Sequence, residues 1–424
     1  MLFCNIDLLD EKFETKRNQY VGVKDGRIAY IGASEPEEDF GERYDGRHRL
    51  LMPAFYNVHS HAPMTLLRGY AENLPLQRWL GEKVFPFEDQ IDDEAAYYGT
   101  LLAISEMLAS GTASFSDMYF FFGGMVPAIL ESGIKCNLSR GLTVFDDSDY
   151  TDLPAYRDNV RLRGEWNGAN NGRLIGDLCI HGEYKIVEAV AQHARETGAR
   201  IQIHLSETQT EHEECKGRHG LTPAAYMEKH GIFDSPTTAA HCVWLEDGDF
   251  DILKKHGVTV ACCPASNLKL ASGYANVPKM LESGINVALG TDGAASNNNL
   301  NIMQDMYLFG VVYKGYFRDP TIITPAEVLR AATRAGALSQ GRDDSGLLAV
   351  GMRADLCVLN TDTPQFTPMT SAACNVVYAA QGADIRMTMV DGEVLYRDGE
   401  FKTIDIEKVK AEVQRRTDSI LSRL

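Results

Sequence analysis

Long apolar runs are missing from this sequence of 424 residues. No apolar run reaches about 18 residues, roughly the length that a membrane-crossing helix requires. The first residues also lack the cluster of basic side chains with which a secretory leader begins. We therefore expect a soluble, cytoplasmic protein that has no membrane partner.

Basic charge is scarce as well, because 41 Lys and Arg residues stand against 59 Asp and Glu residues, a net charge of −18. Nucleic acid binding requires a cationic face, so nucleic acid is not an expected partner. The nine cysteines include no pair with CxxC spacing. An odd number of cysteines, several of them in apolar runs, indicates free buried thiols in a reducing compartment.

β-Hairpin signals are present at both ends of the chain. The pairs Asp25-Gly26 and Asp391-Gly392 each lie between alternating apolar runs, a pattern typical of hairpin turns. Because chain termini often lie close together, we expect residues 1–52 and 351–424 to build one small β-sandwich domain. The amphipathic segment 404–424 predicts a helix that caps this same domain.

The middle of the chain, residues 53–350, alternates helix-like segments ending in glycine with apolar, strand-like segments. This pattern is typical of α/β proteins with a parallel sheet, and eight such units fit a TIM (β/α)8 barrel. A doubly wound open sheet is the alternative, but the Gly-rich phosphate loop expected after its first strand is missing. The predicted strands are 51–58, 113–119, 134–142, 174–180, 200–205, 237–243, 258–263 and 285–291.

Polar side chains follow several of the predicted strands, where a barrel carries its active site. Each alone has a structural alternative, such as a hydrogen-bonded core histidine or a turn-forming Asp. Together they favour a functional site, because five of the eleven histidines in the chain fall at strand ends. The residues in question are His59, His61, His181, His204, Glu207, His241 and Asp292.

A metal site is the first prediction from this set. Its donors are three neutral nitrogens and one carboxylate, from His59, His61, His204 and Asp292. Such donors suit one zinc, iron or other first-row ion with a water in an open position, and the ion would lower the pKa of that water to about 7. Glu207 then fits a proton shuttle without metal contact, and His241 could orient or polarise the attacking water.

Five separated segments now point to a family. They resemble the amidohydrolase superfamily, and within it the 5-methylthioadenosine/S-adenosylhomocysteine deaminases, which are relatives of the triazine hydrolases. The resemblance covers nearly the whole chain, including the divided β domain. The segments are His59-Ser-His61-Ala-Pro-Met-Thr, His204-Leu-Ser-Glu207-Thr, Ala240-His241-Cys, Ser266-Asn-Leu-Lys-Leu-Ala-Ser-Gly273 and Gly290-Thr-Asp292-Gly.

The resemblance implies one divalent metal per chain, zinc before iron, on the four donors named above. It implies Glu207 as general acid/base, with His241 and Asp292 handling the nucleophilic water. Two-metal relatives carry a bridging lysine at the end of the fourth strand. Here that strand ends in His181, and Lys185 is expected in the following helix, so one metal is the better prediction.

The implied reaction is hydrolytic deamination at C6 of an adenine nucleoside by a metal-activated hydroxide, giving the inosine analogue and ammonia. The substrate class is 5-methylthioadenosine, 5′-deoxyadenosine, S-adenosylhomocysteine or adenosine, and a homo-oligomer, dimer or tetramer, is expected. Hydrolysis of another aminated heterocycle, such as guanine or a triazine, is the alternative. A non-enzymatic scaffold is a further alternative, but its expected mark is a lost ligand and all four ligands are present.

Substrate contacts are carried over on fewer residues. Trp79 and Glu88 match nucleoside contacts of the family, and a carboxylate can accept two hydrogen bonds from a ribose diol. Ordinary packing under a loop is the alternative for Trp79. Arg140 matches an arginine near the amino-acid tail of S-adenosylhomocysteine, and His181 is a further predicted substrate contact.

Three departures from the family pattern lie in or near the expected substrate site. Glu183 adds an unexpected charge, Cys262-Cys-Pro replaces His-Asn-Pro after strand seven, and Ala155 stands where a second tail-binding arginine is usual. A site with one arginine fewer should favour a small, uncharged 5′ group. We therefore rank 5-methylthioadenosine and 5′-deoxyadenosine above S-adenosylhomocysteine.

Overall fold

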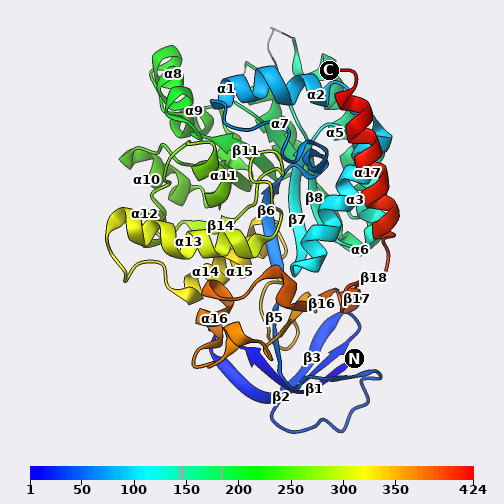
Figure 1. Cartoon of the computed structure of the whole chain (residues 1–424). Helices are drawn as coiled ribbons and strands as arrows, with labels where there is room; N and C mark the ends of the chain where they lie inside the picture. The colour runs from blue at the N-terminus through cyan, green and yellow to red at the C-terminus, as the bar shows by residue number, and fades with distance from the viewer. Residues whose placement is uncertain (143, 145–147, 183–184) are drawn as a thin grey trace.

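The computed structural model of the chain describes residues 1–142, 144, 148–182 and 185–424. Its central part is an α/β fold with two parallel sheets (Figure 1). The first sheet contains β6 (Phe55–Ser60), β7 (Thr112–Tyr119), β8 (Lys135–Arg140) and β9 (Leu174–Gly176). The second contains β10 (Leu178–Ile180), β11 (Ile201–Leu205), β12 (Thr237–His241), β13 (Thr259–Cys262) and β14 (Asn286–Leu289).

All eight predicted strands are therefore present, and two of them differ from the prediction. The first divides at Ala54: β5 (Arg49–Pro53) joins the other sheet of the molecule, and only β6 lies in the central part. The fourth is interrupted at Asp177, whose backbone N–H donates to Leu138 O at 2.9 Å. The first and last strands also meet, because Asp292 N donates to His59 O at 3.0 Å.

Helices surround these strands, as Figure 1 shows. Two predicted glycine caps, Gly133 after α4 and Gly198 after α7, take φ values of +79° and +64°, which favour glycine because it lacks a Cβ. The helices are α1 (Leu76–Trp79), α2 (Phe85–Glu88), α3 (Asp93–Ala109), α4 (Phe122–Ser132), α5 (Pro154–Arg161), α6 (Ala169–Gly172), α7 (Val187–Thr197), α8 (Gln209–His219), α9 (Pro223–Lys229), α10 (Asp247–Lys255), α11 (Pro264–Lys269), α12 (Val277–Glu282), α13 (Ile302–Phe317), α14 (Pro325–Ala332), α15 (Arg334–Ser339), α16 (Ala372–Tyr378) and α17 (Ile406–Leu421), with the short helix η1 (Ala62–Leu67).

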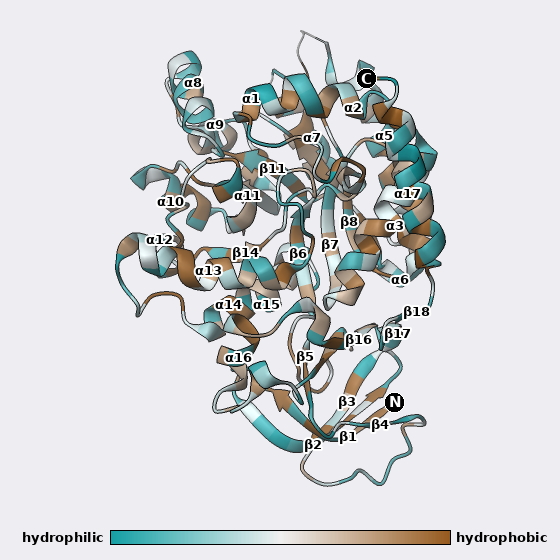
Figure 2. Cartoon of the chain, viewed as in Figure 1, coloured by the Kyte–Doolittle hydropathy of each residue, from teal (hydrophilic) through white to brown (hydrophobic). Residues whose placement is uncertain are grey.

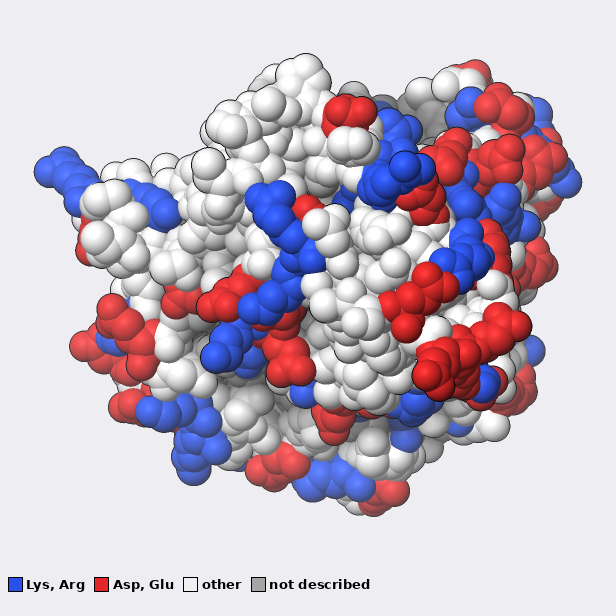
Figure 3. All heavy atoms as spheres, turned by 90° about the horizontal axis from the view of Figure 1, so that it is seen from below, with Lys and Arg blue, Asp and Glu red and all other residues white. Residues whose placement is uncertain are grey.

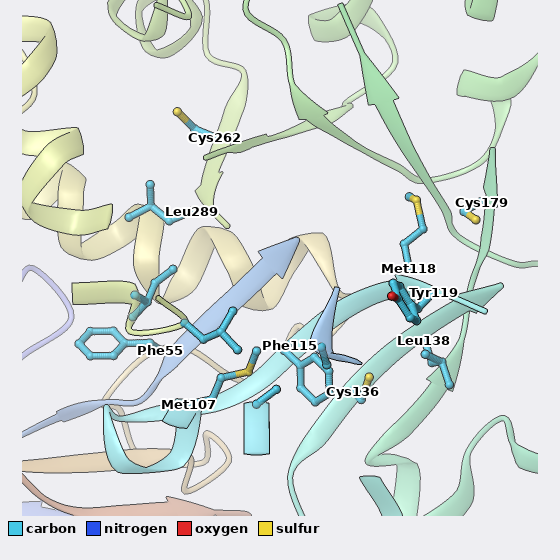
Figure 4. Packing of buried hydrophobic residues seen from close by; sticks show 14 of the residues in the cluster. Phe55, Met107, Phe115, Met118, Tyr119, Cys136, Leu138, Cys179, Cys262 and Leu289 are labelled. Atoms are coloured by element: carbon cyan, nitrogen blue, oxygen red, sulfur yellow. The ribbon is translucent and has the colours of Figure 1, made fainter. Parts of the chain in front are cut away.

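The parallel strands are buried on both faces, and their apolar side chains alternate with buried polar ones such as Asn57, Asp117 and Asn137. Figure 2 shows much white and brown, with some teal, on the central strands, while outer helices such as α8 and α17 carry more teal. Phe55, Phe115 and Cys136 come from neighbouring strands and pack with Met107 of α3 in the core shown in Figure 4. This dry packing holds the strand ends, and the polar side chains on them, in fixed positions.

Strands from both chain ends form one nine-stranded sheet, which we call the terminal sheet. Its order is β18-β17-β16-β15-β5-β1-β2-β3, with β4 beside β1, so the predicted union of the two termini is observed. Both predicted hairpins are confirmed as β2–β3 and β16–β17. The strands are β1 (Leu2–Leu9), β2 (Thr15–Lys24), β3 (Arg27–Gly32), β4 (Arg43–Asp45), β15 (Leu356–Asn360), β16 (Ile385–Val390), β17 (Glu393–Arg397) and β18 (Glu400–Phe401).

The C-terminal helix α17 packs elsewhere than the sequence indicates. Val409, Val413 and Ile420 form its buried stripe against α3, and Thr417 Oγ1 donates to Leu66 O of η1 at 3.1 Å (Figure 1). The prediction that this helix caps the β domain built by the termini is therefore wrong. Its apolar face instead covers the central part of the molecule.

A buried ionic cluster joins the central part to the terminal sheet. Lys135 Nζ, on β8, lies 2.6 Å from Asp355 Oδ2 and 2.7 Å from Asp391 Oδ1, and the side chains of Lys135 and Asp355 are 3% and 0% exposed. Tyr56 of β6 donates its hydroxyl to Asp355 as well. Because buried charges require such partners, this contact fixes how the two parts meet.

Membrane-crossing helices are missing from the described part of the chain, where no helix has the necessary length and apolarity. All nine cysteines are free, and eight of them are buried, as the sequence predicts. Figure 3 shows acidic and basic side chains interspersed over the face that it presents.

Candidate metal and active site

Five polar side chains converge where the parallel strands end. The rings of His61 and His204 have their centroids 4.9 Å from that of His59, and the His241 ring lies 5.3 Å from it. Asp292 follows β14 and places Oδ1 3.6 Å from His59 Nε2. All four predicted ligands thus meet at one point, together with His241.

His61 and Asp292 face each other directly. The Nδ1 of His61 donates to Met118 O at 2.7 Å, which leaves Nε2 3.2 Å from Asp292 Oδ1. Burial alone would lower the pKa of His61, but the hydrogen bond and charge of Asp292 raise it to about 9. The field that holds a proton between these two atoms also attracts a divalent cation to the same place.

The other two histidines predicted as ligands have lowered pKa values, which favour the neutral form. Burial and the neighbouring imidazoles hold the pKa values of His59 and His204 well below the ordinary value. His59 Nε2 and His204 Nδ1 are buried and, among the described residues, have no hydrogen-bond partner. Neutral imidazole is the form that binds metal, so these donors fit a divalent ion.

The ligand atoms fall into two groups that share His59, each with its atoms within 4.8 Å of one another. His59, His61 and Asp292 make one group, and His59, His204 and His241 make the other. The sequence assigned His241 to the water, not to the metal. Its presence in the second group places this imidazole next to the predicted metal donors His59 and His204.

Three residues at this site have backbone angles that L-amino acids rarely adopt. The φ values are +72° for His241, +61° for Asp292 and +48° for Ser206, which precedes Glu207. Such conformations cost of the order of 1 kcal/mol or more each, and they occur where structure aims side chains at a site. Here they turn the chain sharply at the ends of β11, β12 and β14.

Two serines hold the carboxylate of Asp292. Ser266 Oγ donates to Oδ2 at 2.6 Å, and Ser296 Oγ donates to the same oxygen at 2.9 Å. These bonds leave Oδ1 directed at the histidines. The sequence contained Ser266 within a quoted family segment, but the spacing gave no sign of its contact with Asp292.

Glu207 and His241 lie next to each other on one side of the site. Glu207 Oε2 lies 3.9 Å from His241 Nε2, and Ser272 Oγ donates to Glu207 Oε1 at 3.4 Å. Burial raises the pKa of Glu207 above its ordinary value. His241 Nδ1 donates to Asn267 Oδ1 at 2.9 Å, which directs Nε2 toward Glu207, and Asn267 is another residue that the sequence analysis did not single out.

A cavity of about 330 Å³, here called the site cavity, opens over these groups. Trp79 and Glu88 line it as the sequence predicts; the indole of Trp79 donates to Ala71 O at 3.0 Å. Tyr119 donates its hydroxyl to Glu88 at 2.5 Å, and burial raises the pKa of Glu88 to about 7. The residues around the cavity include His61, His181, His204, Glu207, His241, Asp292 and Ser296.

His181 stacks on His204 with ring centroids 4.7 Å apart, and burial lowers its pKa to about 4. The sequence suggested that Lys185 lies in the helix that follows the fourth strand. It lies instead in a turn just before α7. Cys262 is buried at the end of β13, where its thiol lies 3.1 Å from the Tyr313 hydroxyl. Glu183 lies outside the described residues.

Arg140 is the one predicted substrate residue that does not line the site cavity. It ends β8 and lines a neighbouring cavity, and its Nε donates to Asp158 Oδ2 at 3.0 Å. The other predicted residues are brought together as expected, with His59 lying beneath the cavity and 2% exposed.

Comparison with known proteins places these features in a family. The model of the Amidohydrolase family matches residues 50–395. A 5-methylthioadenosine/S-adenosylhomocysteine deaminase of Pelotomaculum thermopropionicum is 39% identical over 414 residues, covering 94% of this chain and 95% of the relative. A 5′-deoxyadenosine deaminase of Methanothermobacter thermautotrophicus is 38% identical over 393 residues, 92% of each chain.

Solved structures agree. An adenosine deaminase from Xanthomonas campestris with bound zinc superposes with a TM-score of 0.91 at 27% identity, over 99% of this chain and 98% of that one. An atrazine chlorohydrolase from Arthrobacter aurescens in complex with zinc has the same fold, with a TM-score of 0.90 at 21% identity over 98% and 99% of the two chains. From the match over most of its length and from the relatives near 39% identity, this chain belongs to the amidohydrolase family.

Proposed function

We propose that this chain is a metal-dependent hydrolase that deaminates adenine nucleosides at C6, giving ammonia and the inosine analogue. One observation carries this proposal: a buried Glu207 carboxyl and the His241 imidazole lie 3.9 Å apart, beside a histidine and aspartate donor set at the floor of one cavity. The similarity to deaminases of adenine nucleosides supports the choice of substrate class.

The metal is proposed to be one zinc ion per chain, held by His59, His61, His204 and Asp292. The zinc reported with two structural neighbours supports zinc over iron. When bound, the ion would supply Lewis acidity, which can lower the pKa of water from about 15.7 to about 7.

The chain's own residues carry out the proton transfers of the proposed reaction. Glu207, whose pKa is raised by burial, gives a proton to N1 of the adenine ring and so makes C6 electrophilic. Water adds to C6 while His241, held by Asn267, orients it and Asp292 accepts a hydrogen bond or proton from it. The proton taken from water then passes to the amino group, the C6–N bond breaks and ammonia leaves, while the proton of the C6 hydroxyl returns to Glu207 and the C6 carbonyl forms.

Substrate orientation is proposed to come from the rim of the site cavity. Glu88 accepts hydrogen bonds from the ribose diol, and Trp79, fixed by its bond to Ala71 O, packs against the nucleoside. His181 Nδ1 lies 3.2 Å from Leu142 O and donates to it, which leaves Nε2 to contact the base. These contacts exclude water from the reacting atoms when substrate is bound.

The architecture that supports this site is proposed to be a closed TIM (β/α)8 barrel of residues 53–350. The backbone bonds from Asp292 to His59 and from Asp177 to Leu138 support closure. The strands of residues 1–52 and 351–424 are proposed as a composite β-sandwich domain, while the C-terminal helix α17 packs on the central part. A homo-oligomer in the cytoplasm, a dimer or tetramer, stays a prediction, and light scattering on the purified protein tests its assembly.

The test is metal analysis and ammonia release on one purified sample, with 5-methylthioadenosine, 5′-deoxyadenosine, adenosine, S-adenosylhomocysteine, guanine and a triazine as substrates. We expect one metal per chain and release from the adenosine analogues. One metal with release only from guanine or the triazine would replace the substrate class. A folded, zinc-supplemented sample that binds no metal and releases no ammonia would overturn the proposal in favour of a scaffold.

A further inference from the structure

A second cavity, of about 600 Å³, lies beside the site cavity and is here called the side cavity. The two share Phe85, Glu88 and Phe120 in their walls, so a molecule held over the metal donors can extend into both. Most of its described lining is apolar, including Phe121, Leu142, Leu153 and Ala155. A nucleoside whose base occupies the site cavity therefore has space for a substituent in the side cavity.

The one basic side chain in the described lining of this cavity is already paired. Arg140, 17% exposed, donates Nε to Asp158 Oδ2 at 3.0 Å and Nη1 to Gly141 O at 2.7 Å. Its guanidinium also lies over the Phe120 ring, 4.9 Å from the centroid. The cation is thus oriented and neutralised from within the protein.

Helix α5 supplies both the carboxylate that pairs with Arg140 and a small side chain that leaves space in the side cavity. Asp158 and Ala155 are three residues apart and so lie on one face of this helix. Ala155 lines the side cavity without filling it, and Asp158 reaches Arg140. The remaining charged residues of the described lining, Glu88 and Asp89, are acidic.

We propose that the side cavity receives the 5′ substituent of the nucleoside, and that Asp158, by pairing with Arg140, makes it select an uncharged, apolar substituent over one that carries a carboxylate. This inference rests on the proposed deamination. A carboxylate entering the cavity must compete with Asp158 for Arg140 while facing two further acidic side chains. Like charges and imperfectly paired groups of this kind disfavour the wrong ligand, whereas a methyl or methylthio group simply fills apolar space.

Wild-type protein gives the first test through two nearly isosteric probes. One is 5′-deoxyadenosine carrying a carboxyethylthio group at the 5′ carbon, and the other is its carboxamide. We expect kcat/KM for the carboxamide to exceed that for the carboxylate by about tenfold or more, in line with the discrimination that unpaired buried charge produces. A carboxylate that reacts as fast as the carboxamide would overturn the inference.

Variants assign the selectivity to the ion pair. Asp158→Asn keeps the shape of the side chain and releases Arg140, so the carboxylate-to-carboxamide ratio of kcat/KM should rise by about fivefold or more. Asp158→Glu should restore the wild-type ratio. Asp152→Asn, which removes an exposed carboxylate from the preceding segment, is the matched control and should leave the ratio unchanged. Because each ratio is measured within one protein, partial loss of folded enzyme cancels.

Each outcome has a distinct meaning. An unchanged ratio in Asp158→Asn would overturn the role of Asp158 while leaving the deaminase intact. A preference for a 5′-aminoethylthio probe over 5-methylthioadenosine would overturn the choice of an uncharged group, because the acidic lining would then recruit cations. Absence of ammonia from every nucleoside, in zinc-loaded folded protein, would overturn the proposed function and this inference together.

Discussion

The pKa of the Glu207 carboxyl is raised because of where this residue lies in the fold. It follows Ser206, whose positive φ turns the chain at the end of β11, and it is then held by Ser272 away from bulk water. A buried carboxyl with one hydroxyl donor keeps its proton at higher pH than a solvated one, which suits a group that must both give and accept protons.

The substitution Glu207→Gln tests this role. The amide retains size and hydrogen bonding but cannot transfer a proton, so kcat with 5′-deoxyadenosine should fall by about 10²–10⁴-fold while metal content stays at the wild-type level. Glu213→Gln, on the exposed surface of α8, serves as the control. Activity of Glu207→Gln close to that of wild type would contradict the assignment.

Asn267 acts through another residue. Its Oδ1 accepts the Nδ1 proton of His241 and so decides which ring nitrogen faces Glu207. We expect Asn267→Ala to lower kcat by about 10–100-fold with a smaller change in KM, as is typical for residues that orient a site histidine. Asn267→Asp keeps the acceptor and should recover part of the loss; equal defects in both variants would indicate a structural role only.

At the scale of single residues, the sequence predicts the metal donors but not the residues that hold them by hydrogen bonds. Histidines at strand ends are visible because the period of a parallel sheet places them together, and all five converge. Asn267, Ser266 and Ser296 were missed, because an amide or hydroxyl on a short helix or in a turn has many possible partners. The pairing of Arg140 with Asp158 was invisible too, since it depends on how α5 packs against β8.

Among the elements, β8 carries a charged side chain with a specific partner at each of its two ends. Arg140 ends it beside the side cavity, and Lys135 begins it within the ionic cluster under the terminal sheet. Burial alone would raise the pKa of Asp355, but the Lys135 ammonium and its hydrogen bonds lower it below the ordinary value. The ionised cluster therefore favours the folded state.

Lys135→Met should destabilise the protein by about 3–5 kcal/mol, because it leaves buried carboxylates without their cation. A carboxyl with a lowered folded pKa stabilises fully above its unfolded value of 3.8, and that contribution is lost as the pH falls through the folded pKa. The difference between wild type and variant, measured by urea unfolding, should shrink as the pH falls. It shrinks first as Asp355 of the variant, whose pKa burial raises once Lys135 is gone, takes up a proton, and further below pH 3.8 as the wild-type carboxyl loses its stabilising charge.

The exposed Lys16, which pairs with Asp10 and Glu14, provides the control, and Lys16→Met should change stability little at any pH. A difference between wild type and Lys135→Met that persists unchanged in acid would show that Asp355 is not the partner that matters.

Element by element, glycine caps and apolar strands were sufficient to place all eight central strands. The failures lie where the chain changes partners without changing its composition. The run 51–58 reads as one strand, yet it divides at Ala54 between two sheets. The amphipathic stripe of α17 predicts that the helix buries one face, but it cannot say which neighbour covers that face.

On the scale of the whole molecule, the metal donors couple folding to function. His59 lies in the first central strand and His61 just after it, His204 lies in the middle of the chain, and Asp292 follows the last central strand. One ion would therefore tie together segments more than 200 residues apart. Because a metal that binds only the folded state stabilises it, the ion should raise the melting temperature.

Chelation of the purified protein should therefore lower both Tm and activity, and added zinc should restore both in proportion to the zinc bound. Calorimetry and ammonia release on the same samples provide the measurement, with a chelator already saturated with zinc as the control. Unchanged Tm and activity in demonstrably metal-free protein would contradict a metal at these donors.

The terminal sheet also has a consequence for how the protein is made. Strand β5 lies between β1, from the first residues, and β15, which belongs to the last fifth of the chain. During synthesis on the ribosome, one edge of β5 stays without its partner until the segment from Leu356 to Asn360 has emerged. Most of the central segment is translated before then, so it can begin to fold first, while the terminal sheet can be completed only after β15 to β18 have been translated.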